Sequence, residues 1–118
     1  MARLPADART PLQARIDALC ASGRVRLDEE EAVALAQALE GVEGEIWLFG
    51  SRVEPERRGG DIDVLVLSEA PPFETSQRIT TGFFARCEER IDAVVLDPAR
   101  LDPAQADFLA RLKRIRLS

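Results

Sequence analysis

Residues 45–67, EIWLFGSRVEPERRGGDIDVLVL, decide the fold of this chain. A short apolar and aromatic run at 45–49 is followed by a Gly-Ser pair, and a second apolar run at 61–67 follows a Gly-Gly pair. Runs of this length that contain β-branched or aromatic residues and are bounded by glycines are typical of strands. We therefore predict a first strand over 45–49 and a second, central strand over 61–67.

Two helices are predicted before the first strand. The stretch TPLQ at 10–13 supplies an N-cap, a proline at the first helical position and a capping-box Gln, and apolar residues then recur at helical spacing to about Ser22. Asp28 and Glu31 form a second capping-box pattern. That second helix is expected to end at Gly41, since glycine commonly closes a helix.

The chain after the central strand continues as a helix, a strand and a helix. Ile79, Phe83 and Cys87 recur at helical spacing, and a third strand is predicted over 91–96. A further cap and capping-box pattern begins a last helix, which we predict over 102–116 because apolar residues keep the spacing and basic residues favour a helix C-terminus. The alternation predicts a small α/β (α+β) fold.

Length and composition limit the possible classes of protein. The chain has 118 residues, 46% hydrophobic and 31% charged, which is typical of one soluble domain over 1–118. We expect a cytoplasmic protein, because the start carries no secretory h-region and no apolar run is long enough to span a bilayer. A net charge of -5 disfavours general nucleic-acid binding. Cys20 and Cys87 are expected to be buried, reduced thiols, and without histidine no Cys/His zinc site can form.

Two acidic residues begin the central strand. Because side chains alternate along a strand, Asp61 and Asp63 are predicted to project to the same side. Close carboxylates raise each other's pKa, and a divalent cation that prefers oxygen ligands relieves this repulsion. The alternative is that both aspartates only begin a strand near solvent, as acidic residues that protect sheet edges do.

Two neighbouring features are also candidates for a site. After the first strand, Gly50 allows close approach of the backbone to an anion, and a turn starting at Ser51 directs amides and a hydroxyl toward phosphate. An ordinary turn with Ser51 as a cap is the alternative. Asp92 lies at the start of the third strand and joins the other carboxylates if that strand pairs beside the second. Otherwise it is a strand-start residue.

Together these features resemble the minimal nucleotidyltransferases (MNT-type) of the nucleotidyltransferase superfamily. The match comprises LFGS at 48–51, the loop 52–60, DIDVLV at 61–66 and IDAVV at 91–95, about half of the chain. The family fold implies a small mixed sheet of at least three strands with flanking helices, divided here into N-terminal helices (1–42), a catalytic core (45–97) and a C-terminal helix (102–116). One departure is that RVEP stands where many relatives have Arg-Ala-Arg-Gly, so the contacts to the triphosphate are less well defined than the metal ligands.

The resemblance implies nucleotidyl transfer with two divalent ions, Mg²⁺ or Mn²⁺. Asp61 and Asp63 would hold both ions, and Asp92 would complete the acceptor-side site and could take the proton of the acceptor.

The resemblance also assigns the phosphate contacts. Gly50 and Ser51 would bind the β- and γ-phosphates of ATP, and Arg52 would add a charge-assisted contact. Arg57 and Arg58 are weaker candidates for the same role. All three arginines have the alternative of being solvated loop residues.

The acceptor follows only from the size and layout of the family. Small relatives are often encoded with a helical HEPN-type toxin, and some act as antitoxins that transfer AMP onto a Tyr of that partner. Transfer to a small hydroxyl compound and a non-catalytic module that binds a partner are the alternatives. A homo-oligomer is also expected if apolar surface near the last helix needs covering.

Overall fold

A four-stranded mixed sheet lies at the centre of the computed structural model, which describes residues 10–118. Its strands are β1 (Glu45–Phe49), β2 (Ile62–Leu67), β3 (Ile91–Leu96) and β4 (Arg114–Arg116). They lie in the order β3-β2-β1-β4, with β2 parallel to β3 and antiparallel to β1, and with β4 antiparallel to β1. The predicted fold class, a small mixed sheet with flanking helices, is confirmed.

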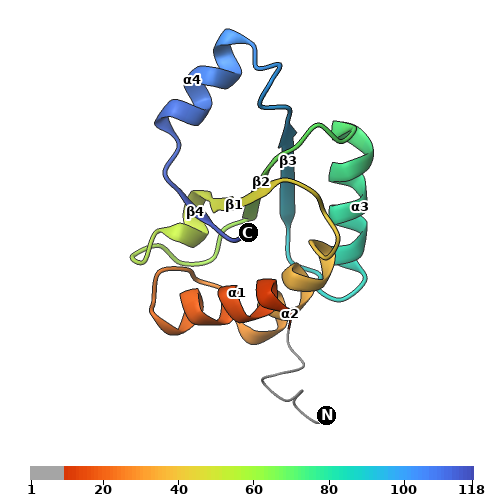
Figure 1. Ribbon diagram of the computed structural model, residues 1–118. Helices are drawn as coiled ribbons and strands as arrows, with labels where there is room; N and C mark the ends of the chain where they lie inside the picture. The colour runs from red at the N-terminus through yellow and green to blue at the C-terminus, as the bar shows by residue number, and fades with distance from the viewer. Residues whose placement is uncertain (1–9) are drawn as a thin grey trace.

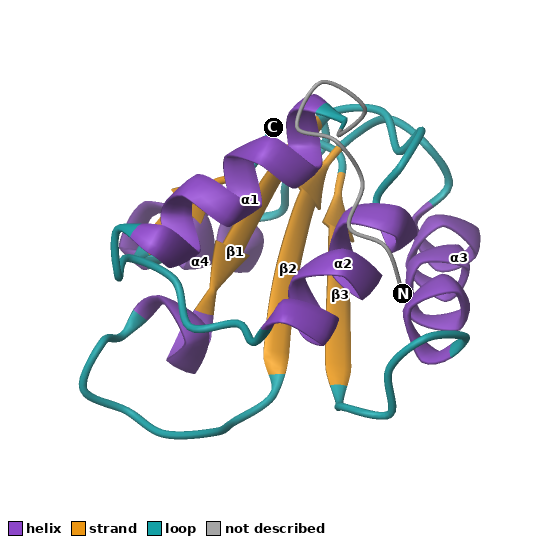
Figure 2. Cartoon of the chain, turned by 90° about the horizontal axis from the view of Figure 1, so that it is seen from below, coloured by secondary structure: helices purple, strands orange, loops and turns teal. Residues whose placement is uncertain are grey.

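The helices lie on both sides of this sheet (Figure 1). They are α1 (Pro11–Ala21), α2 (Glu29–Ala38), α3 (Pro72–Phe84) and α4 (Pro103–Arg111), and a short 3-10 helix, η2 (Gly50–Val53), follows β1. Figure 2 shows α1 and α2 in front of the strands, with α4 behind them. α3 packs against α2 and β3. α4 stands apart, and all of its residues keep at least partial exposure.

The hydrophobic core lies between the sheet and helices α1, α2 and α3. Alternate strand residues face it, so β2 contributes Ile62, Val64 and Val66. The helices contribute large side chains that are at most 2% exposed: Ile16, Leu19, Leu35, Leu39, Ile79 and Phe83. The intervening residues of β2 and β3, which include Asp63 and Asp92, therefore face the side on which α4 lies.

Side-chain caps fix where the helices begin. Thr10 Oγ1 accepts from the Gln13 amide at 3.1 Å, which begins α1 as predicted. The side-chain amide of Gln13 donates to Asp17 at 3.0 Å, so the predicted capping box of α1 is only half formed. The capping boxes predicted for α2 and α4 are both formed.

The prediction of a helix over 102–116 is wrong at its C-terminal end. α4 ends at Arg111, and the chain returns to form β4 on the free edge of β1. Backbone bonds extend this pairing, with the Leu117 amide donating to the Ile46 carbonyl at 2.7 Å. Leu117 is 3% exposed and belongs to the core. The pairing of β4 with β1 and the burial of Leu117 thus outweigh the helical spacing of these residues. A longer α4 would have had little burial to stabilise it, since α4 itself has no buried residue.

Two smaller expectations need revision. α3 ends at Phe84, before Cys87, although Cys87 is buried as expected. Cys20 is only partly buried, and both cysteines are free thiols. Within residues 10–118 every helix is too short or too polar to span a bilayer. The stretch 1–9, on which the expectation of no secretory signal depends, lies outside the described residues.

Candidate active site

A pair of carboxylates lies side by side at one end of the sheet. The third strand pairs beside the second, which is the condition under which Asp92 can join the other carboxylates, and the parallel register sets Asp63 of β2 directly opposite Asp92 of β3. Asp61 precedes β2 and is exposed, as is Asp92, whereas Asp63 is half-buried. Because neighbouring strands are about 4.8 Å apart, the Asp63 and Asp92 side chains share one small region of the surface.

The charges of the other two carboxylates both act on Asp63. The pKa of Asp63 is raised, first by partial burial, then by the charge of Asp92 and then by that of Asp61. Ionised Asp63 is therefore held at a cost in free energy. A cation placed among these oxygens would lower that cost.

The carboxylates have the chemistry of a magnesium site without forming a closed cage. Among residues 10–118, no three Asp, Glu, Cys or His side chains converge closely enough to hold a metal ion by themselves. Magnesium is commonly held by one or two protein carboxylates together with the phosphates of a substrate. The adjacent Asp63 and Asp92, with Asp61 nearby, fit that mode of binding.

Two glycines allow the backbone to approach this region closely. Gly50 has a φ of +76°, and a Cβ at this position would overlap with Oδ2 of Asp63. Gly60 has a φ of +88°, and a Cβ there would overlap with the hydroxyl of Ser51. Only glycine fits both the left-handed conformation and the contact at these positions. Gly50 thus brings the end of β1 against the half-buried carboxylate.

Ser51 lies within η2 and not at its cap. The N-cap of η2 is Phe49, so the alternative of Ser51 as a capping residue is wrong. The Ser51 hydroxyl donates to the carbonyl oxygens of Gly59 and Asp61. Both distances are 3.5 Å, which is long for a hydrogen bond. Ser51 therefore lies beside the segment that leads into the carboxylates, with a hydroxyl that is only weakly engaged.

Arg52 is buried and is engaged by a carboxylate of the protein itself. It is 5% exposed, so the alternative of a solvated loop residue is wrong. Its Nη1 and Nη2 atoms donate to the two carboxylate oxygens of Glu31, both at 2.9 Å, and its Nε donates to the Gly60 carbonyl at 3.0 Å. A contact between Arg52 and phosphate would require some of these bonds to be exchanged. Arg57 and Arg58 are exposed.

Sequence reasoning missed two residues that shape this end of the sheet, Arg26 and Glu31. Arg26 donates to the Ser51 carbonyl at 2.7 Å and to the Glu54 carbonyl at 2.9 Å. Glu31 was predicted only as a capping-box residue, yet it also binds Arg52. These partners are more than twenty residues apart, so local spacing carries no signal for them.

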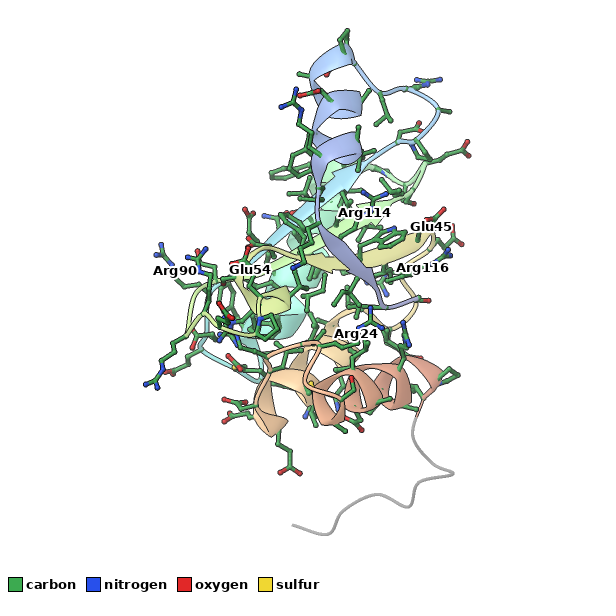
Figure 3. All side chains as sticks on the ribbon, turned by 90° about the vertical axis from the view of Figure 1, so that its left-hand side faces the viewer. Arg24, Glu45, Glu54, Arg90, Arg114 and Arg116 are labelled. Atoms are coloured by element: carbon green, nitrogen blue, oxygen red, sulfur yellow. The ribbon has the colours of Figure 1, made fainter. Side chains whose placement is uncertain are left out.

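The basic residues of the C-terminal tail contact the sheet. The Arg114 guanidinium lies 4.5 Å from the ring centroid of Trp47, and that of Arg116 lies 5.7 Å from it. Figure 3 shows Arg116 near Glu45 at this edge, and the two side chains form an ion pair at 3.8 Å. The ring of Phe108 in α4 makes an edge contact with the ring of Phe49 in β1, and the two ring centroids lie 5.9 Å apart. These contacts connect α4 and β4 to the face that carries the carboxylates.

Comparison with known families matches residues 30–115 to the family described as a nucleotidyltransferase domain. The matched range spans most of the chain and includes each of the predicted site residues. No curated protein matches the chain. The chain therefore belongs to the nucleotidyltransferase domain family, whose common activity is nucleotidyl transfer.

Proposed function

From the membership of this chain in the nucleotidyltransferase domain family, we propose that it transfers AMP from ATP to a hydroxyl group on a partner protein. Asp61, Asp63 and Asp92 would hold the divalent ions, and Gly50 and Ser51 would contact the triphosphate. The observation that carries this proposal is the register of β2 and β3, which sets Asp63 against Asp92 directly beside the close approach at Gly50.

The transfer step requires an exchange of one bond at phosphorus. The acceptor oxygen forms a bond to the α-phosphorus of ATP, the bond from that phosphorus to the bridging oxygen breaks, and pyrophosphate leaves. Bound Mg²⁺ would neutralise charge on the triphosphate and on the departing pyrophosphate. Asp92 is the exposed carboxylate on β3 and takes the proton of the acceptor hydroxyl.

The half-burial of Asp63 supports a role in holding cations. Burial and two neighbouring charges raise its pKa, so the site without metal contains charge repulsion that cations relieve. ATP brings further oxygen ligands, and nucleotide and metal should therefore bind cooperatively.

The exposure of Asp61 and Asp92 supports a protein acceptor. An acceptor reaches these carboxylates from solvent, on the face of the sheet away from α1 and α2 (Figure 2). A partner protein can present a Tyr, Ser or Thr hydroxyl there, oriented by its own surface. A helical HEPN-type toxin is the partner that the small size and layout favour, with this chain as its antitoxin.

Mass spectrometry of the partner tests the proposal. The chain is incubated with Mg²⁺, ATP and a helical HEPN-type protein encoded beside it, and the partner should gain the mass of one or more AMP units. Asp61→Asn and Asp63→Asn should each abolish the gain. Asp107→Asn is the charge-matched control, since Asp107 is exposed on α4, and it should leave the transfer intact.

The alternative functions give different results in the same experiment. A partner that is bound and inhibited but gains no mass would overturn the proposal in favour of a non-catalytic module. Transfer of AMP to small hydroxyl compounds, with the partner unmodified, would identify a small-molecule acceptor. Calorimetric titration of ATP should give tighter binding with Mg²⁺ than without it, and equal affinities would reject the metal site.

A further inference from the structure

η2 and the loop that follows it, up to β2, direct three carbonyl oxygens onto one arginine. Arg26, which lies between α1 and α2, donates from Nη2 to the carbonyls of Ser51 and Gly59, at 2.7 and 3.1 Å. Its Nε donates to the Glu54 carbonyl at 2.9 Å. One side chain thus ties Ser51 of η2 to Glu54, at the start of the eight-residue loop 54–61, and to Gly59, near its end.

A second arginine holds the same loop from within. Arg52 donates from Nε to the Gly60 carbonyl, the last peptide group before Asp61, at 3.0 Å. Its other nitrogens are fixed by both carboxylate oxygens of Glu31, which is itself held by the capping box at the start of α2. The position of the Gly60 carbonyl is therefore connected through Arg52 to the first turn of α2.

The two arginines also bind each other's backbone. The Arg26 amide donates to the Arg52 carbonyl at 2.8 Å, and Nη1 of Arg52 donates to the Arg26 carbonyl at 2.9 Å. The bonds run in both directions, so displacement of one arginine removes partners of the other. We call Arg26, Arg52 and Glu31 the arginine clamp.

Within the clamp, the charge of Arg52 is neutralised by Glu31, and both carboxylate oxygens of Glu31 are engaged. Burial alone would raise the pKa of Glu31, but hydrogen bonds from Arg52 and from the Asp28 amide outweigh it, and the pKa is lowered. Glu31 therefore stays ionised beside Arg52, and the side chains of this pair are only 7% and 6% exposed. A guanidinium that satisfies a buried carboxylate is poorly placed to leave it for a phosphate, because the carboxylate would remain buried and unpaired.

We propose that Arg26 and Arg52 are positioning residues, which act on the nucleotide through the loop by fixing Ser51 on one side and the Gly60–Asp61 peptide on the other. The functional part of this inference rests on the proposed nucleotide site. Fixing both ends of the loop sets the distance between the Ser51 hydroxyl and the carboxylates before substrate arrives. This role replaces the direct phosphate contact that the sequence predicts for Arg52.

Lysine substitutions test the clamp because lysine keeps the charge but lacks the planar fork of donors. Arg26→Lys and Arg52→Lys are compared with Arg24→Lys, an exposed arginine that lies apart from Glu54 in Figure 3. Arg26 is the less buried of the two clamp arginines, so its variant serves if Arg52→Lys fails to fold by circular dichroism.

The first readout is independent of nucleotide. The exposed Arg57 and Arg58 are trypsin sites within the loop and are present in every variant. Loss of charge-assisted bonds should raise the initial rate of cleavage there about tenfold in the clamp variants. Arg24→Lys should be cleaved like the wild type. Unchanged cleavage in both folded clamp variants would overturn the proposal.

The second readout separates positioning from a merely structural role. The dissociation constant for ATP with Mg²⁺, measured well below the melting temperature, should rise about tenfold in the clamp variants and stay unchanged in Arg24→Lys. Faster cleavage with unchanged ATP affinity would overturn the positioning role. If the wild type itself does not bind ATP with Mg²⁺, the proposed function fails, and the cleavage rates still decide whether the arginines hold the loop.

Discussion

Replacing Gly50 by alanine should separate the fold of this protein from its chemistry. Gly50 has a φ of +76°, a conformation that costs an alanine about 1–2 kcal/mol. The new methyl group would also overlap with Oδ2 of Asp63. A relaxed contact between carbon and oxygen needs about 3.3 Å, so the carboxylate must withdraw by about 1 Å.

That displacement falls on a flexible side chain, so its effect on stability is small compared with its effect on catalysis. Misplacement of a reacting group by about 1 Å can lower the rate of an enzyme about 100-fold. We expect Gly50→Ala to lose about 1–2 kcal/mol of unfolding free energy, which corresponds to roughly 4–8 °C in melting temperature for a domain of this size. Nucleotidyl transfer should fall about 100-fold.

Gly23→Ala provides the matched control. Gly23 has nearly the same φ, +78°, and an added Cβ would meet no atom within 4 Å. It should lose as much stability as Gly50→Ala but keep the transfer rate of the wild type. Thermal unfolding and transfer of labelled AMP are measured on both variants. The reasoning is refuted if the two variants have equal transfer rates, since the contact with Asp63 would then be irrelevant to the reaction.

Two further predictions concern charge and packing. Because the pKa of Asp63 is raised by burial and then by Asp92 and Asp61, the contribution of Asp63 to stability falls as pH rises above about 4, where the unfolded carboxyl ionises first. In urea, Asp63→Asn should therefore be more stable than the wild type at pH 7 but not at pH 3, and inactive. Leu117→Ala should cost about 2–5 kcal/mol in the same assay, because Leu117 is buried. Val33→Ala, at an exposed position, should cost much less, and equal losses would contradict the placement of Leu117 in the core.

The parts of the fold that sequence predicts well are those that depend on neighbouring residues. The first and third strands have the predicted limits, and the second differs by one residue. Each is a short apolar run bounded by turn residues, and this pattern is local. The adjacency of Asp63 and Asp92 was only conditional in the sequence, because it depends on the parallel pairing of the two strands, which the structure supplies.

The missed features depend on partners that are distant in sequence. Glu31 satisfies a helix cap three residues away and also binds Arg52, which lies twenty-one residues further along the chain. The capping role can be predicted from the spacing of Asp28 and Glu31. The contact with Arg52 cannot be predicted from any local pattern. β4 was missed for a related reason, since Ile115 keeps the helical spacing of the preceding residues but lies on a strand that needs the free edge of β1.

The position of the carboxylates explains why the clamp matters. Asp63 lies within β2, where pairing with β1 and β3 fixes its backbone on both sides. Asp61 precedes the strand, so its backbone is not held by strand pairing, and Arg52 holds the adjacent Gly60 carbonyl instead. A site that needs both aspartates within one coordination sphere must order the loop as firmly as the sheet. The arginine clamp does this through α2, so the N-terminal helices contribute to the geometry of the site as well as to the core.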